Sequence, residues 1–373
     1  GYTVSALPAP DLGWQSTSQF DVGMEFGLFD NRLSGSVDYY HQKTKDILLS
    51  VPLPPSNGAG STLKNLGKTE GKGVEASLSV DIFRREQGFN WSTDLIYFFN
   101  REKILELTTP DEKENIGAGW FVGHPLTVIY DYKKIGIWQQ GNVDDGSLAK
   151  QTSPKQFPGQ IRVEDVDGNG IIDPKDRQIL GNFQPRWEGG ITNRFSYRNF
   201  DASVIIYARM GMKVLLPYLT GNSTGSGGFA FFNQSRVNQV KVDYWTEENP
   251  TNAFPAPDAG SAVQWFGSTL GYYDGSFIKC RGINLGYSFS NKLISKLGIQ
   301  SARVYLNTTN PFIIYSPLVK TGLAIDPEGN GYAGTGTLTP QGASERGTPE
   351  RQIAVNLDNP PVRQFILGVN LKF

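Results

Sequence analysis

The chain has 373 residues, of which 19% are charged, 12% are aromatic and 43 are glycine, and its formal net charge is −1. Soluble domains usually carry about 25% charged residues, and a Gly- and aromatic-rich composition favours strands and turns. The near-zero net charge implies no basic surface for nucleic acid, and the single cysteine excludes an internal disulfide and a thiolate metal cluster. No apolar run of about 20 residues suggests a transmembrane helix.

Apolar residues alternate with small polar residues in run after run along the chain. Every second residue from Phe20 to Leu28 is apolar, and the residues between are Asp, Gly and Glu. A period of two predicts a β-strand with one apolar and one polar face. Comparable runs follow at 33–39, 74–82, 91–99, 187–198, 200–211, 276–290, 300–314 and 363–373.

The connections between these runs alternate strictly between short and long. The short ones are 29–32, 84–88, the region of residue 199, and 291–299. The long ones are 48–70, 102–186, 212–275 and 315–362. Short periplasmic turns and long extracellular loops are typical of outer-membrane barrels. A soluble secreted β-sandwich, such as an adhesin or a carbohydrate-binding module with calcium-stiffened loops, is the alternative, but it gives no reason to segregate loop lengths.

The strand count depends on 126–138, which also looks extended. Placing it in the long loop leaves nine strands with every short turn on one side. Nine strands cannot close a barrel in a single-chain bacterial protein, and an open edge in lipid would leave backbone groups unpaired. We therefore predict an all-β, transmembrane antiparallel β-barrel, of which 1–373 supplies about nine C-terminal strands, and we expect further residues upstream.

Eight features along the chain carry a family resemblance. They are DLGWQST (11–17), FDVG (20–23), NLGK (65–68), GKGVE (71–75), YWTEENP (244–250), RGINLGY (281–287), ARVY (302–305) and the terminal Phe373. Together they resemble the SusC-like subfamily of TonB-dependent outer-membrane transporters of the Bacteroidota.

The resemblance implies a 22-stranded barrel in the outer membrane of a Gram-negative bacterium, surrounded by lipid and lipopolysaccharide. It also implies an N-terminal plug outside this chain, a SusD-like surface lipoprotein as lid, and energy supplied through TonB. The implied function is import of oligosaccharides or peptides. Catalysis is not expected, because nothing in the sequence places the only two histidines, His41 and His124, beside a nucleophile.

The segment 165–176 has the spacing of a calcium loop. Oxygen ligands fall at loop positions 1, 3, 5, 7, 9 and 12, with glycine at position 6 for the sharp turn. The last ligand departs from the EF-hand pattern, since it is Asp and not a bidentate Glu. The alternative is an Asp/Asn/Gly turn held by its own side-chain hydrogen bonds. The predicted Ca²⁺ ligands are Asp165, Asp167, Asn169, the Ile171 carbonyl, Asp173 and Asp176.

Aromatic residues in the long loops are candidates for substrate contact, because aromatic faces stack on sugar rings and also suit peptides. Loop self-packing or contact with the lid protein is the alternative. The candidates are Trp120, Trp138, Phe231, Tyr272 and Tyr273.

The last strand carries an apolar face that ends in phenylalanine, which resembles the signal read by the outer-membrane assembly machinery. An ordinary closing strand is the alternative. The residues of this face are Phe365, Leu367, Val369, Leu371 and Phe373.

Overall fold

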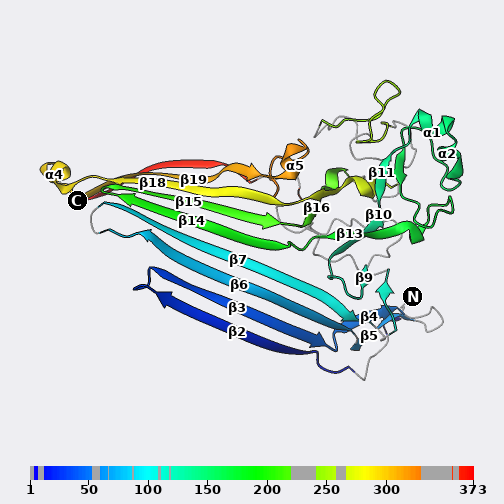
Figure 1. Ribbon diagram of the computed structural model, residues 1–373, viewed down its shortest axis with the longest axis horizontal. Coiled ribbons are helices and arrows are strands. Elements are labelled where there is room, and N and C mark those ends of the chain that lie inside the picture. Colours follow the sequence, from blue (N-terminus) through cyan, green and yellow to red (C-terminus); the bar gives the residue numbers. More distant parts are fainter. Residues whose placement is uncertain are drawn as a thin grey trace.

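Nine strands of the computed structural model form one antiparallel sheet in the order β2-β3-β6-β7-β14-β15-β18-β19-β20. Each strand pairs with the next one of the sheet along the chain (Figure 1). The structure describes residues 4–6, 12–52, 59–65, 67–85, 88–107, 111–116, 119–219, 241–257, 266–328, 355 and 361–373.

The number and order of strands confirm the prediction of a nine-stranded sheet. The segment 126–138 lies outside it, in two small sheets. The strands are β2 (Ser16–Leu28), β3 (Leu33–Lys45), β6 (Lys68–Phe83), β7 (Phe89–Glu106), β14 (Trp187–Tyr197), β15 (Phe200–Met210), β18 (Phe277–Ser288), β19 (Ser301–Tyr315) and β20 (Gln364–Lys372).

The register aligns like residues across the sheet. Val22 lies opposite Tyr39, Tyr39 opposite Val74, and Val74 opposite Phe99, so one row of the apolar face crosses four strands. Ser34, Ser79 and Asp94 form a row of the opposite, polar face in the same way. Because successive side chains alternate between faces, the register keeps the two faces separate over the whole sheet.

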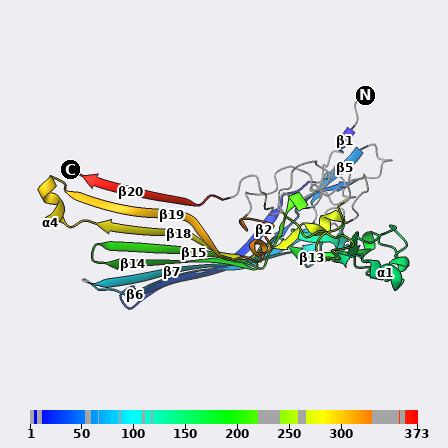
Figure 2. The same cartoon turned by 90° about the horizontal axis from the view of Figure 1, so that it is seen from above.

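The apolar face is open to the surroundings. Phe20 is 59% exposed and Leu367 is 74% exposed, at opposite edges of the sheet. Figure 2 shows the strands stacked side by side, with no layer of helices against them. Large apolar side chains exposed over a whole sheet face are not found on ordinary soluble domains.

The strands extend further than the alternation indicates. β6 begins at Lys68 and β7 ends at Glu106, so the predicted limits of the 48–70 and 102–186 loops fall inside strands. The alternation ends early because Glu70, Lys72 and Arg101 are charged, whereas the backbone ladder continues regardless of side-chain type.

Two tyrosines of the polar face lie over glycines of the neighbouring strand. Tyr40 pairs with Gly73, and Tyr305 pairs with Gly368. A Cβ atom at either glycine would collide with the ring or the hydroxyl group of the tyrosine. Glycine at these positions therefore lets the rings lie flat against the sheet.

The longer connections gather at the end of the sheet opposite α4 (Asn291–Ile294), where the first described strand, β1, also lies (Figure 1). None of the helices in the described ranges is long and apolar enough to cross a membrane. The strands of this region are β1 (Val4–Ala6), β4 (Leu48–Pro52), β5 (Ala59–Asn65), β8 (Glu114–Asn115), β9 (Trp120–Phe121), β10 (Val128–Tyr132), β11 (Lys134–Ile137), β12 (Ile161–Val163), β13 (Arg177–Asn182), β16 (Lys213–Leu215) and β17 (Tyr272–Asp274). The helical turns are α1 (Gln140–Asp144), α2 (Ser147–Lys150), η2 (Pro174–Asp176), η3 (Pro217–Leu219), η4 (Gly267–Leu270) and α5 (Pro317–Lys320).

Candidate functional site

Three of the long connections fold together into one unit with a common hydrophobic core. We call this unit the loop body; it comprises the described residues of 111–183, 212–275 and 316–355. Its core takes residues from each connection, so the three connections share one hydrophobic interior. The fully or nearly buried core residues are Ile137, Ile161, Val163, Ile172, Met212, Val214, Leu216, Leu219, Trp245, Phe254, Leu270, Leu318, Leu323, Ala324 and Val355.

Polar contacts fix the segment 241–257 to the β11 region. Trp245 Nε1 donates to Gln139 Oε1 at 2.7 Å. Lys134 Nζ donates to the carbonyl oxygens of Asn252 at 2.8 Å and Ala253 at 2.5 Å. Burial lowers the pKa of the Lys134 amine to about 8. The amine therefore bridges two backbone carbonyls at a desolvated position.

A second, smaller core lies beside the first. Tyr272 packs against Ile129, Phe183 and Leu215, and its hydroxyl lies 3.0 Å from Asp131 Oδ2. Asp131 is buried, and burial raises the pKa of its carboxyl group. Desolvation and the neighbouring carboxyl group raise the pKa of Tyr272 well above its usual value. The Tyr272 side chain therefore packs inside the loop body and stabilises it.

The predicted substrate-contacting aromatics that the structure describes lie in different parts of the loop body. Trp138 is only 5% exposed, and the Arg162 guanidinium lies 4.4 Å from its ring centre. Trp120 in β9 and Tyr273 in β17 have partly exposed side chains, and Tyr273 packs against the main core. Phe231 lies outside the described residues. Ligand contact by these residues stays a prediction.

The 165–176 loop closes on itself through hydrogen bonds from backbone N–H groups to side-chain carboxylates. Asp165 Oδ1 and Oδ2 accept from the N–H groups of Gly168 and Gly170 at 2.9 and 2.8 Å. Asp176 is buried, and its two oxygens accept from the N–H groups of Val166 and Asp173, each at 2.8 Å. Positive φ angles at Gly168 and Gly170 make the sharp turn. The loop geometry therefore brings the first and the last acidic residue together.

Carboxylate oxygens of Asp165, Asp167 and Asp176 all lie within 4.8 Å of one another. Two oxygens on opposite sides of a Ca²⁺ ion, each about 2.4 Å from it, are about 4.8 Å apart, so these separations are in the range found among the ligands of one ion. Asn169 Oδ1 and Asp173 Oδ1 accept from the N–H groups of Ile171 and Lys175 at 2.6 and 2.7 Å. Further lone pairs remain on these oxygens. The donor set fits a hard divalent cation.

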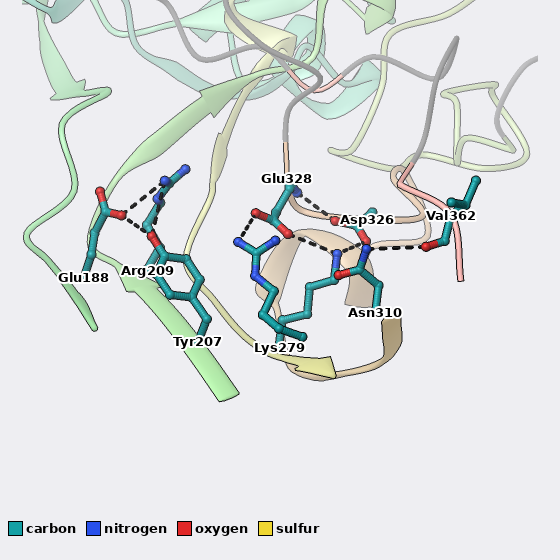
Figure 3. A network of polar contacts seen from close by, with 9 residues as sticks. Glu188, Tyr207, Arg209, Lys279, Asn310, Asp326, Glu328 and Val362 are labelled. Atoms are coloured by element: carbon teal, nitrogen blue, oxygen red, sulfur yellow. Dashed lines mark hydrogen bonds and ion pairs between the residues drawn. The ribbon is translucent and has the colours of Figure 1, made fainter. Parts of the chain in front are cut away.

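A buried ionic cluster joins the nine-stranded sheet to the loop body, and the sequence pattern did not predict it. Lys279 of β18 is 1% exposed, and its Nζ lies 2.6 Å from Asp326 Oδ2 and 3.1 Å from Glu328 Oε2. Arg281 Nη2 lies 2.6 Å from Glu328 Oε1. Figure 3 shows the two carboxylates above the lysine. We call this set of four residues the wall–loop cluster.

A second polar group extends the wall–loop cluster across the sheet. The Arg281 guanidinium lies 4.8 Å from the centre of the Tyr207 ring. Glu188 accepts a short hydrogen bond from the Tyr207 hydroxyl and pairs with Arg209 at 3.1 Å (Figure 3). The only sequence signal for the wall–loop cluster was two basic residues flanking Cys280 in a strand whose other residues are uncharged.

The last strand has the predicted faces. β20 pairs with β19 from Gln364 to Lys372, and Phe365, Leu367, Val369 and Leu371 lie exposed on the apolar face. Phe373 follows the strand and is also exposed. A role of these residues as an assembly signal stays a prediction.

An antiparallel sheet that is apolar on its exposed face and polar on the other, with its long loops folded together at one end, is a section of β-barrel wall. The sequence profile of the family described as TonB dependent receptor-like, beta-barrel, matches residues 1–133. TonB-dependent receptor P3 of Formosa agariphila is 30% identical over all of this chain, and TonB-dependent receptor SusC of Bacteroides thetaiotaomicron is 27% identical over 85% of it. The chain is thus part of the barrel of a SusC-like TonB-dependent receptor.

The solved structures agree on the fold. The RagAB peptide importer in its open-open state superposes on the whole chain with a TM-score of 0.68 at 24% identity. The chain covers 36% of that structure, 36% of the Formosa receptor and 31% of SusC. It therefore spans about a third of the relatives that it matches.

Proposed function

We propose that the chain forms part of an outer-membrane importer of oligosaccharides or peptides, energised through TonB and covered by a SusD-like lipoprotein. In this view the nine strands form part of the barrel wall, and the remaining strands and the plug come from residues outside this chain. The loop body faces the exterior, where it forms part of the binding cavity for substrate and lid. This region binds the substrate and gates its passage, and no covalent bond is made or broken in it.

The observation that carries the proposal is the exposed apolar face of the sheet. Neither a second sheet nor a helix layer covers it in the described part of the chain. Lipid is the environment in which such a face is stable, and the polar face then lines a wet interior. Membership of the receptor family supports the same placement.

Charge scanning tests the placement in lipid. Leu78 and Ser79 are neighbours in β6 and point to opposite faces. Lysine at a lipid-facing position near the bilayer centre costs about 2–4 kcal/mol, whereas lysine facing the interior does not carry this cost. Leu78→Lys should therefore reduce the amount of protein in the detergent-extracted outer membrane, and Ser79→Lys should not. Equal yields of the two variants, or recovery of the wild type from the soluble fraction, would contradict the proposal.

Uptake measurements test the transport function. Cells that depend on the complete protein should accumulate a labelled oligosaccharide or peptide pool, and loss of TonB or of the neighbouring lipoprotein should abolish this accumulation. The pool that is taken up identifies the substrate class. Uptake that persists without TonB would contradict an energised importer.

We also propose that the 165–176 loop binds one Ca²⁺ ion that stiffens the loop body. The supporting observation is the convergence of the Asp165, Asp167 and Asp176 carboxylates, together with the burial of Ile172 of the same loop in the main core. Terbium luminescence or calorimetry on the complete protein in detergent tests this. Asp167→Asn should weaken Ca²⁺ binding, and Asp111→Asn, which changes an exposed acidic residue outside the loop, should not. The same titration curve for both variants and the wild type would exclude this site.

A further inference from the structure

Two rows of charged side chains cross the apolar face at the end of the sheet where the loop body lies. In the first row His41 lies opposite Lys72, and Lys72 lies opposite Arg101. In the second row Lys43 lies opposite Glu70, and Glu70 lies opposite Lys103. Since strands are about 4.8 Å apart and alternate residues about 7 Å apart, the six side chains form a compact patch roughly 10 Å wide. We call it the basic rim.

The basic rim carries more positive charge than its own carboxylate can neutralise. Glu70 lies 2.8 Å from His41 Nε2, 2.9 Å from Lys103 Nζ and 3.8 Å from Lys43 Nζ. Lys72 is exposed and forms no ion pair with any described carboxylate. Four permanent cations therefore surround one anion. Lys72 and Arg101 lie directly opposite each other, and like charges in this position are destabilising, so an anion from outside the chain would stabilise the pair.

Arg101 is held in place by groups outside the basic rim. Its guanidinium lies 4.7 Å from the centre of the Phe99 ring and donates to the carbonyl oxygens of Pro185 at 3.0 Å and Arg186 at 2.9 Å. It therefore contributes a fixed positive charge, while the lysines keep free donors for a ligand.

The height of the basic rim on the sheet matches the headgroup level of a membrane. The row directly below it is Tyr39, Val74 and Phe99. On β7 the apolar face continues from Phe99 to Phe89 without a charged residue. These ten residue steps span roughly 34 Å along the strand, or roughly 26 Å along the membrane normal at a tilt of about 40°, against an apolar band of about 25 Å in such barrels.

We propose that the basic rim binds the phosphate groups of a phosphorylated glycolipid of the outer leaflet, whose acyl chains lie against the apolar face below. This assignment rests on the membrane location in the proposed function. Phosphate oxygens are strong acceptors with multiple negative charge, and ammonium groups at hydrogen-bond distance recognise them as point charges. Lys43, Lys72 and Lys103 supply these donors, and the apolar row below supplies the surface for the chains.

Binding of defined lipids to the complete, detergent-extracted protein tests the assignment. The probes are a bisphosphorylated lipid A, the same lipid after phosphatase treatment, and inorganic phosphate. The Lys43→Gln/Lys72→Gln variant removes two charges without touching the two short contacts of Glu70 with His41 and Lys103. At about 1 kcal/mol for each basic residue near a membrane surface, its affinity for the phosphorylated lipid should fall about 30-fold.

The control is Lys150→Gln, which removes an exposed lysine at the end of α2 in the loop body and should leave the affinity unchanged. Gel mobility with and without heating shows that each variant is still a folded barrel. Equal affinity of the double variant, equal binding of the dephosphorylated lipid, or displacement of the lipid by inorganic phosphate at the same phosphate concentration would each overturn the assignment. Absence of the wild type from the membrane fraction would instead refute the proposed function.

Discussion

Replacing Lys279 with methionine should release the loop body from the barrel wall. Lys279 is 1% exposed, and methionine fills a similar volume without charge. Asp326 then keeps a desolvated carboxylate without its cation, whereas Glu328 keeps Arg281 at 2.6 Å. Breaking a buried ion pair costs about 3–5 kcal/mol. Because Glu328 remains paired, we expect the lower value, about 3 kcal/mol, or about 150-fold in the equilibrium between docked and released loop.

Hydrogen exchange followed by mass spectrometry on the complete protein measures this change. Peptides that cover 316–328 should exchange about 100-fold faster in Lys279→Met, whereas peptides from β2 and β3 should not change. The double variant Lys279→Met/Asp326→Leu should recover most of the protection, because it removes the orphaned charge together with its partner.

The exposed pair Lys133–Glu164 provides the control for this experiment. Its atoms are 3.1 Å apart, but the two side chains are 51% and 38% exposed. Lys133→Met should therefore cost less than about 1 kcal/mol and change exchange less than about 5-fold. If Lys279→Met behaved like this control, or if the double variant were no better protected than the single one, the buried pair would not hold the loop to the wall.

Two further changes probe the loop body. Gly159 has φ +88°, and a Cβ atom there would lie 2.7 Å from the Trp245 ring. Gly159→Ala should therefore lower the stability of the loop body by about 2–3 kcal/mol, which faster proteolysis would show. The control is Gly141→Ala in α1, where a Cβ atom meets open space, and this variant should be neutral or slightly stabilising. The pKa of Lys134 is lowered to about 8 in the folded protein, so the lysine of the unfolded chain binds its proton more tightly. The free energy of unfolding should therefore rise between pH 8 and about 9.5, a window that ends below the pKa of tyrosines in the unfolded chain. In a series of thermal unfolding measurements over this pH range, Lys134→Met should abolish the rise.

The sequence predicted the wall well, because a lipid environment imposes alternation on every spanning strand. It misplaced the ends of β6 and β7, because charged residues such as Lys72 and Arg101 interrupt the apolar pattern while the backbone ladder continues. The turn at Gly168 and Gly170 could be predicted, since the hydrogen bonds that shape it join residues a few positions apart.

The common core of the loop body could not be predicted in this way. Ile137, Leu216 and Leu318 come from three different connections and share no sequence period. The partners of Lys279 are likewise 47 and 49 residues away in the sequence. Contacts of this kind depend on how the strands bring distant segments together, and a single sequence carries no local signal for them.

The two tyrosines that lie over glycines, Tyr40 over Gly73 and Tyr305 over Gly368, affect how the polar face would contact anything that the closed barrel encloses. Each ring occupies the space that a side chain at the glycine would take, so the polar face is flat at these two positions. At these two positions a neighbouring body would therefore contact the ring and the hydroxyl group of a tyrosine, and not a groove between side chains. Alanine at either position would displace the tyrosine ring from the sheet, and at position 73 its Cβ atom would also meet the Phe99 carbonyl oxygen.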